Sequence, residues 1–300
     1  MAETSADING VRICYETIGD PGGRPLLLVM GLGGPMIWWD DELCELLADR
    51  GFRVIRFDNR DCGRSQSMTG QASLVGSLLG SWTGARVGQP PPYTLADMAD
   101  DAAGLLDHLG IDAAHVTGVS LGGMIAQTLA IRHPARVTSL VSVMSTTGGR
   151  RVGWPHPRVL PSLLGRAPRG RQAYEEAVLA TFKLIGSPGF DFDEERMRVR
   201  ARRTYDRGIN RAGTLRQLVA ITSAADRAPR LRGLRVPALV IHGKADPLVH
   251  VSGGTATARA IPGAELILVP GMGHDLPRAV WPTLVDGVDR TARRAVSSHT

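Results

Sequence analysis

The sequence predicts an α/β fold in which helices flank a mostly parallel central sheet, with a helical insertion in the second half of the chain. Short, continuously apolar runs alternate with stretches of helical periodicity, as expected of strands buried on both faces of a parallel sheet. The alternation stops over residues 146–232, where only helical or loop character is visible, and resumes after Val236-Pro237. A chain of 300 residues can bury about 75% of its unfolded surface, so one core with one insertion accounts for its length.

The apolar runs predict the strands in order along the chain. The first is Leu26–Met30, in which every residue is apolar. Similar runs follow at residues 52–57, 114–118, 137–144, 238–242 and 265–269. The clearest helix begins at Thr94, which has capping-box spacing to Asp97, and stops at Gly110. A second helix is expected directly after residue 120, ending at His133-Pro134 because proline does not continue a helix.

The chain is expected to divide into a core and a lid. Residues 1–145 and 233–300 carry the strand and helix alternation and form the predicted core, whereas residues 146–232 form the predicted lid. Prolines at positions 155, 157, 161 and 168 interrupt the first part of the lid. Residues 65–92 form a second irregular stretch, which is rich in Gly and Ser. It is long for a structureless loop, so we expect a short helix there, near the functional pocket.

The positive charge is concentrated in one part of the chain. The formal net charge is +6, but Thr146–Arg230 alone holds 17 Lys and Arg against 8 Asp and Glu. A run of arginines in this region is interpreted as the solvated face of a helix; its members are Arg196, Arg198, Arg200, Arg202, Arg203 and Arg207. Two alternatives stay open, because a basic lid would also attract acidic substrates or dock to an anionic lipid surface. No nucleic-acid-binding motif accompanies these charges, so no nucleic-acid partner is expected.

Other features of the composition narrow the class of protein. No apolar run reaches the ~18 residues that a membrane-spanning helix needs, and the first residues lack the apolar stretch of a secretory signal. We therefore expect a cytoplasmic protein, of an oligomeric state that the sequence does not indicate. Cys14, Cys44 and Cys62 are widely spaced and show no metal-ligand pattern, so they are predicted to be free thiols. No metal and no cofactor are expected.

The segment His115–Met124 predicts a serine nucleophile. It has the pattern of a short apolar strand, a tight glycine turn around Ser120 and the start of a helix. In such a turn the serine has a strained backbone and projects its hydroxyl from the sheet, while glycine at positions 118 and 122 lets neighbouring backbone approach closely. The alternative is an ordinary glycine loop before a helix, so the partners that a nucleophile requires decide between the two.

A serine nucleophile needs a base to take its proton and a carboxylate to fix the tautomer of that base. Asp246 follows one of the late apolar strands, and His274 follows the next through a glycine turn. Because both residues come at the carboxyl ends of parallel strands, they are expected at the sheet edge where Ser120 emerges. The strand after the nucleophile helix ends in Met144-Ser145-Thr146-Thr147 without a carboxylate, so Asp246 is the predicted acid.

Other polar and aromatic residues near these motifs are assigned mainly structural roles. His242 and His250 are expected to be structural, and Asp275 to point away from the ring of His274. Asp58 and Asp61 are expected to organise their turn or, alternatively, to line the pocket. The remaining histidines, at positions 108, 115, 133, 156 and 299, are predicted to be solvated or to cap helices. The tryptophans at positions 38, 39, 82 and 154 either belong to the core or reach the pocket.

Together, these motifs resemble the α/β-hydrolase superfamily over nearly the whole chain. The order serine, aspartate, histidine is the order that this fold uses, and residues 57–65 are similar to the family's turn after an early strand. Within the superfamily, the chain resembles the branch of aclacinomycin methylesterase and related actinobacterial carboxylesterases. That similarity lies in residues 28–34, 58–65, 271–274 and 276–277.

The resemblance implies an oxyanion hole formed by two backbone N–H groups. One belongs to Leu121, directly after the nucleophile, and the other to Leu32, in the loop after the first apolar strand. Many relatives carry His-Gly where this chain has Met30-Gly31. Since the donor is a backbone group, the hole should persist while the bracing of the loop changes. A dinucleotide-binding loop at residues 31–34 is disfavoured, because methionine replaces the third glycine of that motif.

The resemblance further implies hydrolysis of a carboxylic ester through an acyl-enzyme. Epoxide hydrolases and haloalkane dehalogenases of this fold carry aspartate at the position of Ser120, so those reactions are disfavoured. The expected partner is a small-molecule ester of apolar character. The same residues could cleave a thioester, a lactone or a carbon–carbon bond beside a ketone, or carry out perhydrolysis, and the fold does not decide among them. A small-molecule receptor that keeps the triad is the non-enzymatic alternative.

Overall fold

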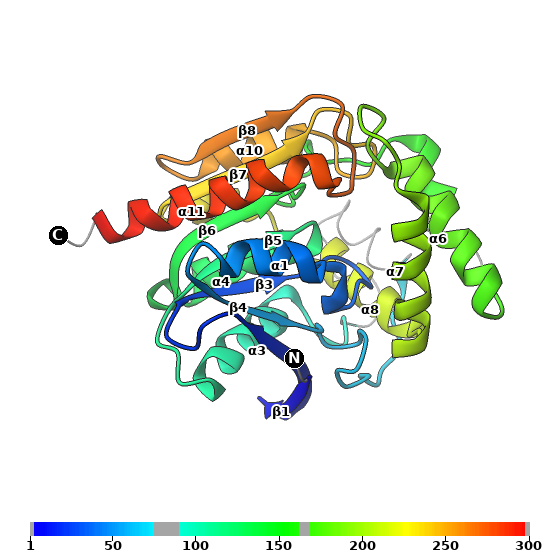
Figure 1. Ribbon diagram of the computed structural model, residues 1–300, viewed down its shortest axis with the longest axis horizontal. Coiled ribbons are helices and arrows are strands. Elements are labelled where there is room, and N and C mark those ends of the chain that lie inside the picture. The colour runs from blue at the N-terminus through cyan, green and yellow to red at the C-terminus, as the bar shows by residue number, and fades with distance from the viewer. Residues whose placement is uncertain (1–2, 75–89, 162–167, 298–300) are drawn as a thin grey trace.

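The computed structural model describes residues 3–74, 90–161 and 168–297, which form a central sheet between two layers of helices (Figure 1). The sheet has eight strands in the order β1-β2-β4-β3-β5-β6-β7-β8. The strands are β1 (Thr4–Ile8), β2 (Val11–Ile18), β3 (Arg24–Val29), β4 (Phe52–Phe57), β5 (Ala114–Val119), β6 (Val137–Val143), β7 (Ala238–Gly243) and β8 (Glu265–Val269). β2 pairs antiparallel with β1 and β4, and all other neighbours are parallel. The predicted α/β class with a mostly parallel sheet is confirmed.

Strands β3 to β8 match the six predicted strands, whereas the hairpin of β1 and β2 was not predicted. Its turn is Asn9-Gly10, with φ of 51° and 78°. Two successive residues with positive φ are the requirement of a two-residue hairpin turn, for which Asn-Gly is strongly preferred. This dipeptide is the signal from which the hairpin could have been found.

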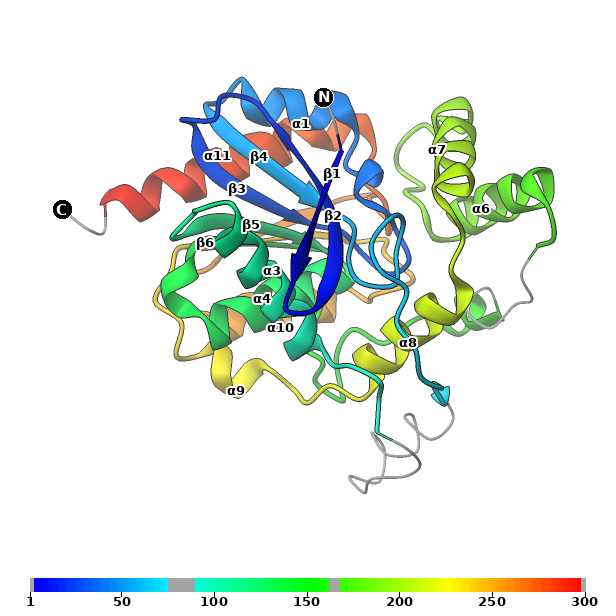
Figure 2. The same ribbon diagram turned by 90° about the horizontal axis from the view of Figure 1, so that it is seen from below.

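Helices cover both faces of the sheet (Figure 2). One face carries α1 (Asp41–Ala48) and α11 (Trp281–Ser297), and the other carries α3 (Leu95–His108), α4 (Leu121–Arg132) and α10 (Ser252–Ala260). Helix α3 begins as predicted, because Thr94 and Asp97 form a reciprocal capping box. The shorter helical turns are η1 (Met36–Trp38), η2 (Pro134–Arg136), η3 (Pro157–Val159), α9 (Ala228–Leu231) and η4 (Arg278–Val280).

Residues 146–232 connect β6 to β7, and we call them the inserted segment. Their described parts contain α6 (Arg171–Ile185), α7 (Glu194–Arg207) and α8 (Arg211–Thr222), together with η3 and α9. α6, α7 and α8 lie beside the carboxyl ends of the parallel strands (Figures 1 and 2). The short helix expected within residues 65–92 falls largely on residues 75–89, outside the described ranges, and Trp82 lies there too.

The arginine run on α7 is a solvated face only in part, which corrects the prediction: the side chains of Arg202 and Arg203 are 36% and 48% exposed, whereas that of Arg207 is buried. Each of its six arginines pairs with at least one carboxylate; the partners are Glu3, Asp40, Asp41, Asp58, Glu175, Glu176, Glu194 and Glu195. Arg207 is the most deeply placed, with a side chain only 5% exposed between Glu3 and the fully buried Asp58. The periodicity of the run could not reveal these pairs, because several of the acids are more than 100 residues away in the sequence.

Several smaller expectations can be checked in the described ranges. No helix there combines the length and the apolar composition needed to cross a membrane. Cys14, Cys44 and Cys62 are buried and free of disulfide bonds, as predicted. His115 contradicts its prediction, because it is buried in β5 with Nδ1 2.9 Å from Oγ of Ser139. A single histidine in an apolar strand gives no sign of such a partner on the neighbouring strand. His299 lies outside the described residues.

Candidate active site

Ser120 lies in a tight turn between β5 and α4, where it is the N-cap of the helix. Its φ is 56° and its ψ is −118°, a combination that residues with a side chain rarely adopt. The flanking glycines permit the turn. A Cβ at Gly118 would overlap the carbonyl of Gly122, and a Cβ at Gly122 would overlap the carbonyl of Val29. The strand, glycine turn and helix predicted around Ser120 are therefore all present.

The structure brings Ser120, Asp246 and His274 together from three separate loops. Nε2 of His274 lies 3.0 Å from Oγ of Ser120, and Nδ1 of the same ring lies 2.7 Å from Oδ2 of Asp246. Asp246 and His274 are both buried. Because each residue follows the carboxyl end of a parallel strand, the topology of the sheet places all three at one edge.

The surroundings of Asp246 favour its ionised form. Oδ1 accepts hydrogen bonds from the backbone N–H groups of Leu248 and Val249, at 2.8 and 2.9 Å. Burial alone would raise the pKa of this carboxyl, but the facing imidazoles of His274 and His242 hold its pKa well below the usual range. An ionised Asp246 accepts a hydrogen bond from Nδ1–H of His274, which leaves Nε2 free to accept the hydroxyl proton of Ser120.

The neighbouring titratable residues take different places around this group. His242 lies against the acid, with Nε2 2.8 Å from the carbonyl of Val249 and 3.5 Å from Oδ2 of Asp246, while its buried Nδ1 has no hydrogen-bond partner among the residues that the structure describes. His250 instead contacts Oγ of Ser252. Asp275 accepts a hydrogen bond from Ser187, and burial raises the pKa of its carboxyl. Of the three, only His242 touches the predicted acid.

The loop after β3 passes directly beside Ser120. A Cβ at Gly31 would lie 3.2 Å from Cβ of the serine. The backbone N–H groups of Leu32 and Leu121, which flank this space, donate no hydrogen bond to any residue in the described ranges. Free backbone donors next to a nucleophilic serine are what an oxyanion-binding site requires.

Two side chains brace this loop, and sequence reasoning identified neither in that role. Nδ2 of Asn59 donates to the carbonyl of Met30 at 3.0 Å, and Oε1 of Gln217 accepts from the N–H of Gly33 at 2.8 Å. The turn that holds Asn59 is organised as predicted. Asp58 accepts hydrogen bonds from the backbone of Met36 and Arg64, and Asp61 from that of Met68.

The described tryptophans at positions 38, 39 and 154 lie in different surroundings. Trp39 is fully buried and Trp154 is 51% exposed. Trp38 lies at the loop after β3, where a Cβ at Gly34 would be 3.6 Å from its ring, and it packs on Phe182 of α6 with the ring centroids 5.2 Å apart. Trp38 is thus the tryptophan placed between the inserted segment and the loop beside Ser120.

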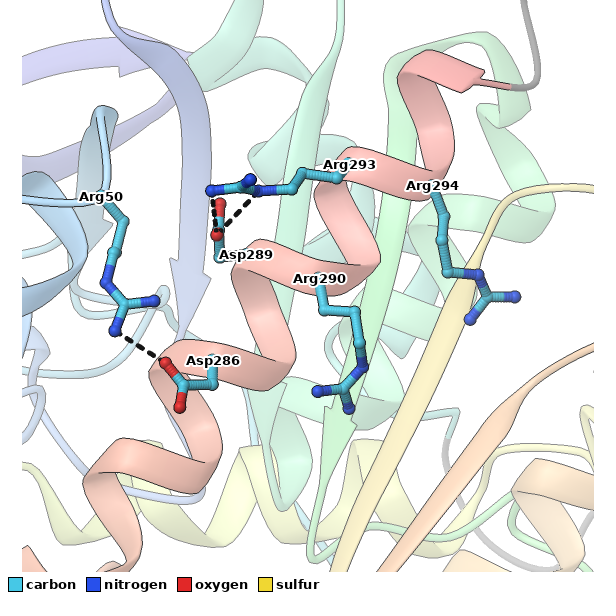
Figure 3. A pocket seen from close by; sticks show the side chains of 6 residues that line it. All are labelled: Arg50, Asp286, Asp289, Arg290, Arg293 and Arg294. Atoms are coloured by element: carbon cyan, nitrogen blue, oxygen red, sulfur yellow. Dashed lines mark hydrogen bonds and ion pairs between the residues drawn. The ribbon is translucent and has the colours of Figure 1, made fainter.

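Figure 3 shows a surface pocket on α11, lined by Arg50, Asp286, Asp289, Arg290, Arg293 and Arg294. Its charges are paired. Arg50 forms an ion pair with Asp286 and Arg293 with Asp289, and both Arg290 and Arg294 pair with Glu265. None of its lining residues is a nucleophile, and none belongs to the loops of Ser120, Asp246 and His274, so we place the site at those loops. No group of three or more His, Cys, Asp and Glu side chains within the described ranges is arranged to hold a metal ion.

Comparison with known proteins places this geometry in a family. Residues 24–277 match the family model of the alpha/beta hydrolase fold. The chain is 29% identical to rhodomycin D methylesterase of Streptomyces sp. (strain C5), covering 95% of this chain and 96% of that one. It is 27% identical to a putative carbamate hydrolase of Caulobacter sp. (strain K31), over 87% of this chain and 88% of the other. An enol-lactonase from Burkholderia xenovorans LB400 has a similar structure, with a TM-score of 0.70, 25% identity and coverage of 98% and 100%. The chain therefore belongs to the α/β-hydrolase fold family and is a hydrolase.

Proposed function

We propose that this hydrolase cleaves carboxylic esters through an acyl-enzyme, with Ser120 as nucleophile, His274 as base and acid, and Asp246 as the carboxylate that orients the histidine. The observation that carries the proposal is the continuous contact from Oγ of Ser120 to Nε2 of His274 at 3.0 Å and from Nδ1 to Asp246 at 2.7 Å. A nucleophile, a base and an orienting carboxylate in hydrogen-bond reach of one another are what acyl transfer requires.

Acylation begins when Oγ of Ser120 attacks the ester carbonyl carbon and His274 takes the hydroxyl proton at Nε2. The carbonyl electrons move onto its oxygen, and the backbone N–H groups of Leu32 and Leu121 stabilise that charge. The tetrahedral intermediate then expels the alkoxide, which takes the proton from Nε2. Asp246 stays ionised throughout and stabilises the imidazolium.

Deacylation repeats these steps with water. His274 removes a proton from a water molecule, the hydroxide attacks the acyl carbon, and Ser120 leaves with the proton returned from Nε2. The products are a carboxylic acid and an alcohol. All proton transfers run through one nitrogen, which fits its position beside Oγ of Ser120.

The substrate is proposed to be a small apolar ester that binds between the core and residues 146–232, which would serve as the lid. Methyl esters are the first substrates to test, because one relative is named a methylesterase. The aromatic contact of Trp38 with Phe182 supports this, since it sets an apolar side chain of the core against one of α6 next to the loop after β3.

The test is hydrolysis of p-nitrophenyl esters with acyl chains from two to sixteen carbons, together with methyl esters of aromatic acids, by the parent and by Ser120→Ala. Ser223→Ala is the matched control, because that hydroxyl is exposed and bonds only within α8. The proposal expects turnover that is lost in Ser120→Ala and kept in the control. Turnover that survives in Ser120→Ala, or a folded parent with none, would refute it.

A lactone is the second candidate substrate, favoured by the similarity to an enol-lactonase. The same residues would open the ring, and the alcohol would stay attached to the acyl group as it leaves Ser120. Comparing kcat/KM for a lactone with that for its open-chain methyl ester decides between the two. A receptor that keeps the triad would instead acylate once and release no second product.

A further inference from the structure

The inserted segment is hydrogen-bonded to the loop that carries His274. The backbone N–H of His274 donates to the carbonyl of Ile185 at 2.7 Å, and the N–H of Gly273 donates to Oγ of Ser187 at 2.9 Å. Ser187 in turn donates to the carboxylate of Asp275. One hydroxyl therefore joins residues on both sides of the histidine.

This contact is close along the backbone. A Cβ at Gly189 would lie 2.6 Å from Cα of Gly271, and a Cβ at Gly273 would overlap the carbonyl of Gly186. The N–H of Gly189 also donates to the carbonyl of Gly271 at 2.9 Å. Because glycines on the two sides remove the side chains that would separate them, the end of α6 and the histidine loop pack as one unit.

A second contact joins the inserted segment to the loop beside Ser120. Gln217 of α8 is fully buried, and its two polar atoms are both used. Oε1 accepts from the N–H of Gly33 at 2.8 Å, and Nε2 donates to the carbonyl of Arg60 at 2.8 Å. Gly33 directly follows Leu32, so this side chain helps to fix where the N–H of Leu32 lies relative to the serine.

We propose that Ser187 and Gln217 are positioning residues through which the inserted segment holds the base and the oxyanion donor in register with Ser120. The inference rests on the proposed function. Both loops have few side chains of their own to pack, because residues 31, 33 and 34 of one and 271 and 273 of the other are glycine, so contacts from outside contribute to holding them in place. A displacement of a catalytic group by about 1 Å can reduce turnover by about a hundredfold. These two contacts are therefore expected to affect kcat.

The proposal separates the effects on kcat and KM. No hydrogen bond joins the side chains of Ser187 and Gln217 to Ser120 or to the ring of His274, so they would not touch the reacting atoms. Their loss would leave the apolar binding wall in place while the base or the oxyanion donor moves. Turnover is therefore expected to fall with little change in KM.

The experiment compares Ser187→Ala and Gln217→Met with two matched controls, Ser223→Ala and Gln172→Met, at exposed residues directly after α8 and on α6. Rates of p-nitrophenyl acetate hydrolysis are divided by the concentration of serine sites that a fluorophosphonate labels. Unfolded protein then does not lower the measured kcat. We expect kcat to fall about tenfold to a hundredfold in the first pair, with KM within about twofold, and both constants to be unchanged in the controls. Ser187→Thr keeps the hydroxyl and should recover most of the lost kcat.

A second readout does not depend on ester turnover. The proton shared by His274 and Asp246 is expected as a far-downfield imidazole resonance in the NMR spectrum of the parent, and it should broaden or vanish in Ser187→Ala but persist in Gln217→Met. If Gln217→Met fails to fold, Gln217→Asn replaces it, since the shorter side chain cannot reach both partners.

The inference is overturned if Ser187→Ala and Gln217→Met keep the parent kcat, or if Ser187→Ala leaves the resonance unchanged. The inference is also overturned if Ser223→Ala loses as much activity as Ser187→Ala, or Gln172→Met as much as Gln217→Met. Failure of the proposed function looks different: the parent would then show no turnover that depends on Ser120, while the resonance would still report whether Ser187 holds the histidine.

Discussion

Oδ2 of Asp246 faces Nδ1 of His274 at 2.7 Å, while Oδ1 is occupied by two backbone N–H groups. The carboxylate therefore has one oxygen fixed by its own loop and the other directed at the imidazole. Because its pKa is held below the usual range, it remains a hydrogen-bond acceptor at neutral pH. In the proposed mechanism, the tautomer of His274, and with it the basicity that Nε2 offers to Ser120, depends on this contact.

Asp246→Asn tests that dependence. Asparagine keeps the size of the side chain, but its NH2 group would face Nδ1 of His274 and hold the ring in the tautomer that places N–H against Ser120. We expect kcat on p-nitrophenyl acetate to fall about 10⁴-fold, the scale found for the equivalent change in serine proteases. Asp226→Asn, an exposed change of the same kind, is the control. A kcat within tenfold of the parent in Asp246→Asn would exclude the orienting role.

The buried pair of Arg207 with Asp58 is expected to stabilise the contact between α7 and the core. Asp58 is fully buried and the Arg207 side chain is 5% exposed, so Arg207→Met would leave a buried carboxylate without its cation. Removing one partner of such a pair costs about 3–5 kcal/mol in the free energy of unfolding. Equilibrium unfolding in urea measures the loss.

Arg203→Met is the control for that substitution, because Arg203 lies on the same helix but its pair with Asp41 is largely exposed, at 48% and 41%. Exposed pairs contribute about 1 kcal/mol or less. An equal loss of stability in the two variants would show that burial adds nothing to the contribution of the Arg207 pair.

The parts of the fold that could be predicted from the sequence are those whose signals are local. Strands β3 to β8 are short apolar runs, and the glycines that flank Ser120 indicate its turn. Asp246 and His274 could be named because each directly follows a strand, and parallel strands bring such positions to one edge.

The features that were missed depend on partners far away in the sequence. Gln217 binds a backbone N–H 184 residues earlier, and no motif marks a glutamine for that contact. The run of arginines on α7 was interpreted as solvated because the acids that pair with its most buried members, Asp40, Asp58 and Glu3, lie far away in the sequence. The hairpin of β1 and β2 is a different case, since Asn9-Gly10 was a usable local signal.

Gly254→Ala is expected to disturb the acid loop through His242. A Cβ at Gly254 would overlap Nδ1 of His242 and lie 2.9 Å from its Cβ, and His242 is fully buried. Overpacking of this kind costs about 1–3 kcal/mol, against a gain of about 1 kcal/mol from helix propensity. We expect a net loss of stability in urea and a lower kcat, since His242 also lies 3.5 Å from Asp246.

Gly233→Ala provides the comparison for Gly254→Ala, because the nearest atom to its added Cβ is the carbonyl of Arg230 at 3.4 Å. This variant should unfold at the same urea concentration as the parent, or at a slightly higher one. Equal behaviour of the two alanine variants would show that the space around His242 can adapt.

His115 is expected to make the stability of the protein depend on pH. Burial, and then the charge of Arg24, lowers the pKa of His115 from 6.5 to about 4. The unfolded chain therefore takes up a proton near pH 6.5 that the folded protein takes up only near pH 4. Above pH 6.5 the neutral His115 does not reduce the free energy of unfolding. As the pH falls from 6.5 towards 4, protonation of the unfolded chain lowers that free energy by about 3 kcal/mol in all.

His115→Gln removes this titration while keeping a hydrogen-bonding side chain beside Ser139. The free energy of unfolding in urea, measured at pH 7.5 and at pH 5.0, should differ by about 2 kcal/mol less in this variant than in the parent. His250→Gln, a change at an exposed histidine, should leave the parent's pH dependence intact. The prediction fails if His115→Gln loses as much stability between the two pH values as the parent does, because the buried ring would then accept its proton as readily as an exposed one.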